Sequence, residues 1–532
     1  MTNGIPHRGI PFFVADDVRY NFSVYDVVRK GMPTSMRQGF DNEKYIELQA
    51  ANIRKRIAQF GGKLYLEFGG KLFDDYHASR VLPGFEPDTK FRMLESLVDD
   101  VEIVIAINAN HIEKGKTRGD LGIPYDEDVL RLIDVFRSRG FLVGSVVLTQ
   151  YANQPAADAY RHRLEQLGVT CRLHYPIAGY PHDIERIVSD DGYGKNEYIE
   201  TTRPLVVVTA PGPGSGKLAT CLSQLYHEHQ RGIDAGYAKY ETFPIWNLPL
   251  NHPVNIAYEA ATVDLDDANI IDPFHLEAYG ETTVNYNRDV EAFPVLKAMM
   301  ERIMGESPYQ SPTDMGVNMA GYAIVDDDAC RDACRDAARL EIVRRYFAAA
   351  VHLKRTGTGE EQVERLRSIM NRAGVTPDLS PARAVALEKE AATGAPAGAM
   401  VLPDGHVVTG KTGDLLGAAS ALLMHALKAV TGVDETIPVI DDAAIEPICR
   451  LKTEHLNSVN RRLHSDETLI ALSITSATSP VAARVIDGLK QLRGCDAFFS
   501  VIISSTDEAL YRKLGINVCC EPKYERVSLY HR

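Results

Sequence analysis

The chain has 532 residues and a formal net charge of −14, with 45% hydrophobic and 24% charged residues. At about 100–200 residues per domain, this length predicts about three or four domains, whose cores are large enough to fold without disulfides or metals. The acidic balance excludes a protein whose main task is to hold nucleic acid, because neutralising phosphates needs a basic surface. It remains compatible with a local basic pocket for a small anion.

The compartment is indicated by what the sequence lacks. Residues 1–17 have no charged start followed by a long apolar stretch, so they do not form a signal peptide. The longest apolar runs, such as VEIVIAI, are far shorter than the ~20 residues that span a bilayer. The eight cysteines are scattered and form no CxxC pair, which is typical of a reducing compartment. We therefore expect a cytoplasmic protein without membrane contacts.

Strand and helix patterns alternate along the first 200 residues. Helical spacing covers residues 42–60, 126–139 and 155–167, and apolar strands cover 63–68, 101–109 and 141–149. Helices that alternate with such strands are typical of a mostly parallel sheet covered on both faces. The predicted fold class is therefore α/β, with Rossmann-like and P-loop-like βαβ units, a helical segment and a small C-terminal α/β domain.

The rest of the chain divides at changes in this pattern. A polar stretch at 189–204 precedes a second strand–helix–strand unit, which runs into an irregular polar segment at 243–320. Helices are then predicted over 327–351, 359–373, 381–392 and 414–430. A β-hairpin is predicted at 399–409, because Asp-Gly is a strong two-residue turn signal. Apolar strands at 468–477 and 498–505 alternate with helices at 480–493 and 507–514 in the tail.

These changes predict four domains. They are an N-terminal α/β lobe (1–200), a P-loop-like α/β lobe with the long polar segment (201–325), a mainly helical domain with the hairpin (326–435) and a C-terminal α/β domain (436–532). Asn110, Lys116, Arg118 and Asp120 are expected to line the cleft between the first two lobes, where ligands prefer to bind.

A glycine-rich turn is the first candidate phosphate site. A strand at 204–209 runs through Gly, Pro and Ser residues into a helix that begins at Lys217. Backbone N–H groups at such a turn form an anion-binding site, and glycines let the backbone approach a phosphate closely. The predicted phosphate-binding residues are Gly212, Gly214, Ser215, Gly216 and Lys217. The P-loop pattern is degenerate, since Leu218 replaces the Ser or Thr that binds Mg²⁺. A purely structural turn is the alternative.

A second segment, GHVVTGKT at 405–412, fits the P-loop pattern letter for letter. Its His-Val-Val run is typical of the second strand of a hairpin, whereas a phosphate loop needs small residues there. A secondary anion site is still predicted at Gly410, Lys411 and Thr412, because these residues are expected to open a helix. Segments 323–328 and 437–442 end apolar runs in aspartates, as a magnesium-holding strand does, but ordinary strands also end in this way.

The polar segment at 239–318 holds the densest run of chemically capable side chains. The candidate catalytic residues in it are Lys239, Glu241, Asp272, His275 and Asp314. Carboxylates, His and Lys near a phosphate site perform general acid–base work or hold a metal. The alternative is that these side chains cap turns and satisfy loop backbone groups. The identity of any metal is left open.

Several long segments together resemble one bacterial protein family. They are FGGKL (68–72), DDYHASRVLPGF (74–85), TAPGPGSGKLATCLSQLYHE (209–228), AKYETFPIWNLPLNHPVNIAYEAAT (238–262), IDPFHLEAYG (271–280) and SPTDMGVNM (311–319). The family is called domain of unknown function 1846, or uncharacterised protein family 0371. The resemblance covers nearly the whole chain and implies a full-length bacterial cytoplasmic protein. It transfers no catalytic residue. Some members carry the label of an ATP-dependent zinc protease, but HExxH is absent here, since Arg231 stands four residues after His227.

Two hypotheses from different classes follow. The first is an enzyme, such as a phosphotransferase or a ligase, that acts on a nucleotide or a phosphorylated metabolite. ATP or another phosphate-bearing ligand, with Mg²⁺, would be its cofactor. The second is a non-catalytic sensor or assembly protein that binds a small anion, which Leu218 favours. A peptidase is a third option. The expected partners are a small phosphorylated molecule and further copies of this chain in a homo-oligomer, with neither nucleic acid nor membrane.

Overall fold

The computed structural model describes residues 37–70, 72, 75–118, 122–263, 267–334 and 339–525. The amino-terminal segment that the sequence predicts not to be a signal peptide lies outside these residues, and so does Asp120 of the predicted cleft. No helix within the described ranges is long and apolar enough to cross a membrane.

A seven-stranded parallel sheet forms the centre of the first part of the molecule. Its strand order is β4-β3-β2-β5-β1-β6-β9. The strands are β1 (Leu64–Phe68), β2 (Val101–Asn108), β3 (Leu142–Thr149), β4 (Cys171–Leu173), β5 (Leu205–Thr209), β6 (Gly236–Tyr240) and β9 (Gly316–Val317). Strand β5 is apolar along its length except for Thr209, and every residue in it is buried, as expected for a strand covered on both faces. The predicted α/β class is confirmed.

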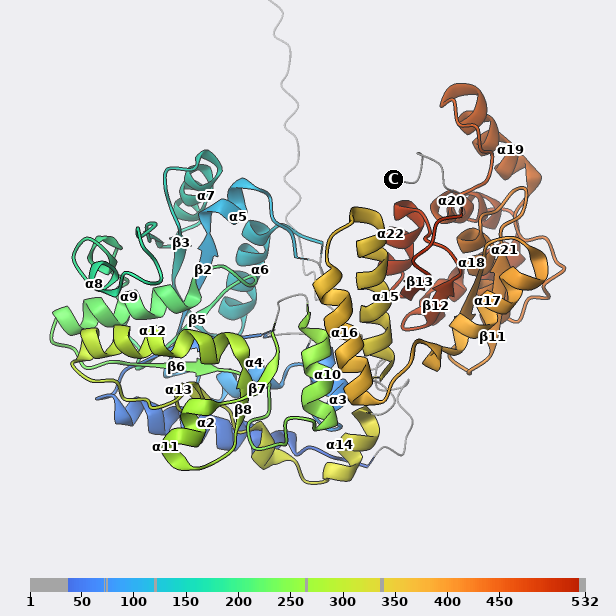
Figure 1. Cartoon of the computed structure of the whole chain (residues 1–532). Coiled ribbons are helices and arrows are strands. Elements are labelled where there is room, and N and C mark those ends of the chain that lie inside the picture. The colour runs from blue at the N-terminus through green and yellow to red at the C-terminus, as the bar shows by residue number, and fades with distance from the viewer. Residues whose placement is uncertain are drawn as a thin grey trace, which may run out of the picture.

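Helices cover both faces of this sheet (Figure 1). The helices of this first part are α2 (Asn42–Gln59), α3 (Tyr76–Val81), α4 (Thr89–Glu95), α5 (Ala109–Glu113), α6 (Tyr125–Ser138), α7 (Pro155–Gln166), α8 (Ile184–Ile187), α9 (Lys217–Gln230), α10 (Pro253–Ala261), α11 (Pro273–Tyr279), α12 (Asn287–Met304) and α13 (Pro312–Met315). Helix α9 packs against α12, and α2 packs against α4. A two-stranded ribbon, β7 (Asn269–Ile271) with β8 (Val284–Tyr286), leads into α12.

The connections around β2 and β5 run in opposite directions across the sheet. From β2 the chain moves through α6 to β3, away from the centre, whereas from β5 it moves through α9 past β1 to β6. Because such crossovers are right-handed, α6 and α9 lie on opposite faces. The neighbouring strands β2 and β5 therefore flank a topological switch point, at which ligands of open α/β sheets bind.

The C-terminal part has its own four-stranded sheet, in the order β11-β10-β12-β13. Its strands are β10 (Ala397–Val401), β11 (Val407–Lys411), β12 (Asp496–Phe499) and β13 (Asn517–Cys520). The antiparallel pairing of β10 with β11 confirms the predicted hairpin. Helix α14 (Asp327–Ala333) still packs against α3 and α10 of the first part. The helices after it are α15 (Arg339–Thr356), α16 (Glu360–Ala373), α17 (Pro381–Thr393), α18 (Ala418–Val430), α19 (Asp442–Arg450), α20 (Ser465–Ser476), α21 (Pro480–Asp487) and α22 (Ser505–Lys513), with a π-helical turn at Leu451–His455.

Helices α15 and α16 join the two parts. Ile256 and Ala260 of α10 share one apolar core with Phe347 of α15 and Phe498 of β12. The rings of Phe347 and Phe498 meet edge to face with their centroids 4.9 Å apart. This shared core places the C-terminal sheet beside the helices that follow the first sheet (Figure 1).

Three secondary-structure predictions are wrong. The strand at 468–477 is helix α20, in which Thr468, Ala471, Leu472 and Thr475 are buried at helical spacing. The helix expected to open at Gly410 begins only at α18, because this glycine ends β11. Segments 323–328 and 437–442 are not strands: their aspartates are helix N-caps, with Asp326 accepting from Ala329 N and Asp441 from Ala443 N.

The predicted domain boundaries remain predictions. Strands from both sides of residue 200 share the large sheet, with β5 inserted between β2 and β1. Strands from both sides of residue 435 likewise share the small sheet, where β12 pairs with β10. Each sheet therefore contains strands from both sides of a predicted boundary.

Candidate functional site

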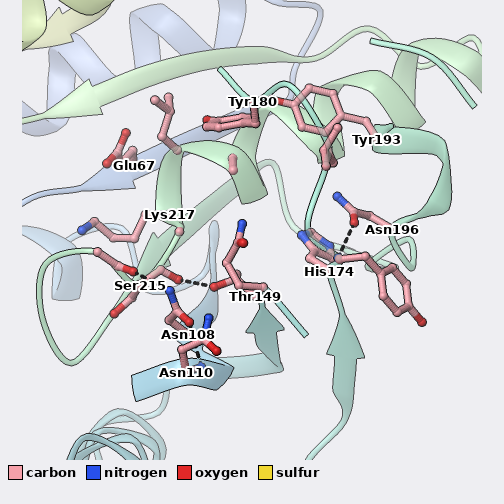
Figure 2. A pocket seen from close by; sticks show the side chains of 17 residues that line it. Glu67, Asn108, Asn110, Thr149, His174, Tyr180, Tyr193, Asn196, Ser215 and Lys217 are labelled. Atoms are coloured by element: carbon pink, nitrogen blue, oxygen red, sulfur yellow. Dashed lines mark hydrogen bonds between the residues drawn. The ribbon is translucent and has the colours of Figure 1, made fainter. Parts of the chain in front are cut away.

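A cavity of about 470 Å³ lies at the carboxyl ends of strands β1 to β5. Its walls span the switch point between β2 and β5, so it occupies the crevice that the topology predicts for a ligand. Figure 2 shows the residues that line it. They are Glu67, Asn108, Asn110, Thr149, Gln150, His174, Tyr175, Ile177, Tyr180, Tyr193, Asn196, Gly214, Ser215, Gly216, Lys217, Leu218 and Ala219.

The glycine-rich turn after β5 lines this cavity and contains unpaired N–H groups. Within the described residues, no group accepts a hydrogen bond from the backbone N–H of any residue from 214 to 219. Only from Thr220 N, which donates to Gly216 O at 3.0 Å, does the helical pattern begin. Free N–H groups at a helix start favour a negatively charged ligand.

The carbonyl groups of the turn are instead paired with side chains. Ser215 Oγ donates to Gly212 O at 2.8 Å. Asn108 Nδ2 donates to Gly214 O at 3.2 Å, and Thr149 Oγ1 donates to Ser215 O at 2.8 Å. These bonds hold three carbonyl oxygens against protein donors. The turn therefore combines free N–H groups with paired carbonyl oxygens at these three residues, which favours an anion.

Two glycines of the turn are required by neighbouring side chains. Gly214 and Gly216 have φ angles of +75° and +89°, in the left-handed region that favours glycine. A Cβ on Gly216 would lie 2.8 Å from Thr149 Oγ1, and one on Gly212 would lie 2.2 Å from Tyr125 Oη. These glycines therefore let the turn pack closely against the side chains of Thr149 and Tyr125.

Lys217 is the first residue of α9 and is half-buried in the cavity wall. In the part of the chain that the structure describes, its ammonium group makes neither a hydrogen bond nor an ion pair. Leu218 follows it in the wall, and this side chain offers no oxygen to a metal. The positive charge at the helix start is thus free for an anionic ligand.

Glu67 is the second charged residue of the wall. Tyr237 Oη, on a buried ring, donates to Glu67 Oε2 at 2.8 Å and fixes the carboxylate. No cation of the described ranges pairs with it. The register of β1 with β6 places Glu67 opposite Lys239, so the two side chains emerge on the same face of the sheet.

The far wall contains residues that the sequence analysis missed. His174 is buried and its Nε2 lies 3.3 Å from Glu197 O. Burial lowers the pKa of His174 to about 3, so the ring is neutral at pH 7. Asn196 Nδ2 donates to Ser223 Oγ at 3.0 Å, and Asn196 Oδ1 accepts from Tyr175 N at 2.9 Å. Gln150 and His174 could have been found from their positions, because they directly follow strands β3 and β4.

Lys239 and Glu241, two of the candidate catalytic residues, form a largely buried ion cluster beside the cavity. Lys239 Nζ lies 2.7 Å from Glu241 Oε1 and 2.5 Å from Asp289 Oδ2. Burial raises the pKa of Glu241, and the nearby Lys239 opposes that rise. The carboxylates around Lys239 raise the pKa of its ammonium group against the effect of burial, so it stays charged. Neither Lys239 nor Glu241 lines the cavity.

Asp272, His275 and Asp314 meet at a different corner, formed by α11 and α13. Asp272 caps α11 by accepting from Phe274 N and His275 N, and it also accepts from Thr313 Oγ1 at 2.6 Å. Ser311 Oγ lies 2.8 Å from His275 Nδ1, and Asp314 Oδ1 lies 3.7 Å from the same nitrogen. A catalytic triad needs the Ser and the Asp at opposite ring nitrogens, so this set does not form one.

The second GK segment has the backbone of a strand. Gly410 and Lys411 pair with Gly398 and Ala397 of β10. Thr412 N donates to Pro396 O at 2.8 Å, so this N–H is not free for an anion. A Cβ on Gly410 would lie 2.2 Å from Leu422 N, which shows that this glycine is required by packing against α18.

The remaining polar residues of interest have protein partners. Asn110 lines the cavity, as predicted for the cleft, and accepts from Gln154 Nε2 at 3.0 Å. Lys116 Nζ lies 3.4 Å from His111 Nε2, and Arg118 pairs with the buried Asp128 at 2.9 Å. His227 Nε2 lies 2.8 Å from Asn196 O. Among the described residues, no three His, Cys, Asp or Glu side chains gather in a metal-binding arrangement.

Comparison with known proteins gives matches along nearly the whole chain. The model of the domain of unknown function DUF1846, N-terminal, matches residues 38–374, and that of the domain of unknown function DUF1846, C-terminal, matches residues 378–530. A UPF0371 protein of Corynebacterium diphtheriae is 59% identical over 499 residues, covering 93% of this chain and 99% of the relative. A UPF0371 protein of Corynebacterium efficiens is 58% identical over 498 residues, with 93% and 100% covered. One from Streptococcus pneumoniae serotype 4 is 55% identical over 496 residues, with the same coverage.

Proposed function

The chain belongs to the DUF1846 family of UPF0371 proteins, as its motifs predicted, and on that premise we propose that it binds a phosphorylated small molecule in the cavity after β5. One observation carries the proposal. Residues 214–219 line the cavity, and their backbone N–H groups are unpaired within the described chain, while side chains pair with three of the turn's carbonyl oxygens. Such an array favours anionic oxygens by direct hydrogen bonds and by the helix dipole.

Lys217 supports the same proposal by its charge. It is half-buried in the cavity wall and has no carboxylate partner among the described residues. A phosphate bound at the N–H groups would gain a charge-assisted hydrogen bond from its ammonium group. A Mg²⁺ ion is not needed for this contact, which fits the absence of a hydroxyl at Leu218.

The residues around the cavity favour an enzyme that acts on this ligand. Glu67 joins the cavity to the largely buried cluster of Lys239, Glu241 and Asp289, because it lines the cavity and lies opposite Lys239 in the sheet. Burial raises the pKa of Glu241 in this cluster, and a carboxyl group of raised pKa near a binding cavity is suited to proton transfer. The reacting end of the ligand would then point toward Glu67.

The experiment compares two lysines in isothermal titration calorimetry with inorganic phosphate, AMP and MgATP. Lys217→Ala should weaken the binding of the tightest of these ligands by about tenfold or more, the usual size of a charge-assisted hydrogen bond. Lys411→Ala is the matched control, because it removes the same group from the second GK segment, where Lys411 is exposed. It should leave the dissociation constant unchanged.

Melting temperatures of both variants verify that the fold persists, which is expected since Lys217 has no described partner. Wild-type protein that binds none of the ligands, or Lys217→Ala protein that binds them as tightly as wild type, would overturn the proposal. Loss of binding in Lys411→Ala alone would move the site to β11. Binding without turnover of any ligand over hours would favour the sensor over the enzyme.

A further inference from the structure

The charges of the cavity wall restrict the chemical class of the ligand further. Resting on the function proposed above, we infer that the ligand is a phosphate monoester of a polyhydroxy compound, such as a sugar phosphate, and that Glu67 is the residue that selects it. The inference starts from the charged groups in the wall, which among its described lining residues are Lys217 and Glu67.

A polyphosphate chain does not suit this wall. A nucleoside triphosphate brings three to four negative charges, which P-loop proteins neutralise with a lysine and a Mg²⁺ ion held by a Ser or Thr. Here Leu218 offers no metal ligand, and the one ammonium group is accompanied by a carboxylate. Figure 2 shows Glu67 and Lys217 on the same side of the cavity. A second phosphate near Glu67 would meet repulsion in a partly desolvated site.

Glu67 forms no ion pair with the lysine opposite it, although Lys239 attracts its carboxylate across the sheet. Lys239 lies opposite it in the sheet, but this ammonium group is already within 2.7 Å of Glu241 and 2.5 Å of Asp289. Tyr237 Oη donates to one carboxylate oxygen of Glu67 and leaves the other free within the described residues. Glu67 therefore presents an acceptor to the cavity, and the hydroxyl groups of a ligand are the donors that fit it.

The other free groups of the wall also suit hydroxyls. His174 Nε2 lies 3.3 Å from Glu197 O, and because a carbonyl only accepts, the ring proton is on Nε2 and Nδ1 is left as an acceptor. The side-chain amide of Gln150 makes no hydrogen bond within the described ranges and offers both a donor and acceptors. His174 lies across the cavity from Lys217 (Figure 2), so a ligand held at its phosphate end extends toward these groups.

The selectivity is tested by calorimetry on wild-type protein with inorganic phosphate, ribose 5-phosphate, glucose 6-phosphate, fructose 6-phosphate and MgATP. At least one sugar phosphate should bind about tenfold more tightly than inorganic phosphate, since hydroxyl contacts to a carboxylate add to the phosphate contact. MgATP should bind more weakly than that sugar phosphate. The inference is overturned if no sugar phosphate exceeds inorganic phosphate, or if MgATP binds most tightly.

Glu67→Gln then tests the residue. Glutamine keeps an acceptor for Tyr237 Oη but removes the charge, so the fold should persist. The ratio of the inorganic phosphate and sugar phosphate dissociation constants should fall by about tenfold, and MgATP should bind more tightly than to wild type. Glu277→Gln, on the exposed surface of α11, is the matched control and should leave both the ratio and the MgATP affinity unchanged.

The outcomes separate this inference from the proposed function. Inorganic phosphate that binds to wild type and is lost in Lys217→Ala supports the phosphate site whatever the ratios are. If Glu67→Gln then leaves the ratio of the inorganic phosphate and sugar phosphate dissociation constants unchanged, only the role of Glu67 and the ligand class are overturned. If inorganic phosphate and all esters fail to bind wild-type protein, both fall together.

Discussion

Glu67 and Lys239 lie opposite each other in the register of β1 and β6 but do not form an ion pair. Lys239 is held instead by Glu241 at 2.7 Å and by Asp289 at 2.5 Å. This leaves the carboxylate of Glu67 to the cavity, where it faces the same space as Lys217. Two features that are far apart in the sequence, the glycine-rich turn and the polar segment after β6, are thereby joined along one edge of the sheet.

Removing Lys239 should destabilise the fold strongly. Lys239→Met removes the nearest cation from the largely buried Glu241 and Asp289, and breaking such a pair costs about 3 kcal/mol of unfolding free energy. The loss should shrink at lower pH, because burial raises the pKa of Glu241 and its protonation removes one of the two negative charges that Lys239 no longer balances. Urea unfolding at two pH values measures both effects.

The control for that variant is Lys195→Met, which breaks the exposed pair of Lys195 with Asp191. Exposed pairs contribute less than about 1 kcal/mol, so the midpoint of unfolding should hardly move. Equal losses in the two variants would contradict the assignment of a tightly packed cluster at Lys239.

Gly216 should not tolerate a side chain. Its φ is +89°, and a Cβ would lie 2.8 Å from Thr149 Oγ1. Gly216→Ala is expected to lower the unfolding free energy by about 2 kcal/mol through strain and the displaced Thr149, and to weaken phosphate binding with it. Thermal unfolding and phosphate titration report the two effects.

Gly405 gives a matched comparison, because its φ of +83° is similar but nothing lies within 4 Å of a Cβ there. Gly405→Ala should therefore cost only the backbone strain, about 1 kcal/mol, and should leave phosphate binding as in wild type. If the two variants lose stability equally, the contact of Gly216 with Thr149 does not shape the turn.

Buried His174 should make the fold sensitive to acid. Its pKa is lowered to about 3 from an ordinary value of 6.5. Between these values the unfolded chain binds a proton at this residue and the folded chain does not, so the unfolding free energy falls as the pH falls. The slope from this residue alone is about 1.4 kcal/mol per pH unit, beginning near 6.5. Above that pH it contributes no slope.

His174→Gln should flatten the stability profile measured by urea unfolding between about pH 4.5 and about pH 8. His229→Gln, which changes an exposed residue of α9, serves as the control and should retain the wild-type slope. A wild-type profile that is level over this range, or one that His174→Gln leaves unchanged, would show that His174 is not held neutral by burial.

The fold was largely predictable because its strands carry strong local signals. Strand β5 is apolar up to Thr209 and β2 is apolar except for Glu102 and Asn108, and helix α6 between β2 and β3 has a clear apolar face. The error at α20 arose because a run of ten apolar, Ser and Thr residues suits either structure. Its helical start depends on Glu467, whose side chain accepts from His464 N, and on contacts of Ser465 with the distant Asp507. The order of strands in the sheets carried no local signal.

The site was predictable only where chemistry is local in the chain. The glycine-rich turn was recognisable because a strand, a turn and a helix start follow one another. Its supporting donors, Asn108 and Thr149, come from the ends of β2 and β3 and were invisible without the sheet order. The same limit affected the polar segment, where Asp272 and His275 were considered together with Lys239 although they pack at a different corner.

The hydroxyl of Thr149 should affect ligand binding through the carbonyl group that it holds. It donates to Ser215 O at 2.8 Å and so holds one carbonyl of the turn against β3. Thr149→Val preserves the shape of the side chain but leaves that carbonyl without its donor, at a cost of about 1–2 kcal/mol in unfolding free energy. The carbonyl is then free to rotate toward the cavity, where it would oppose a phosphate. Phosphate affinity should therefore fall several-fold, with Lys217 and all N–H groups still present. Thr209→Val is the control, since Thr209 is also buried, on β5, but donates to no carbonyl of the turn within the described residues. Calorimetry with inorganic phosphate decides the matter: equal affinities in the two variants would mean that the paired carbonyls do not organise the anion site.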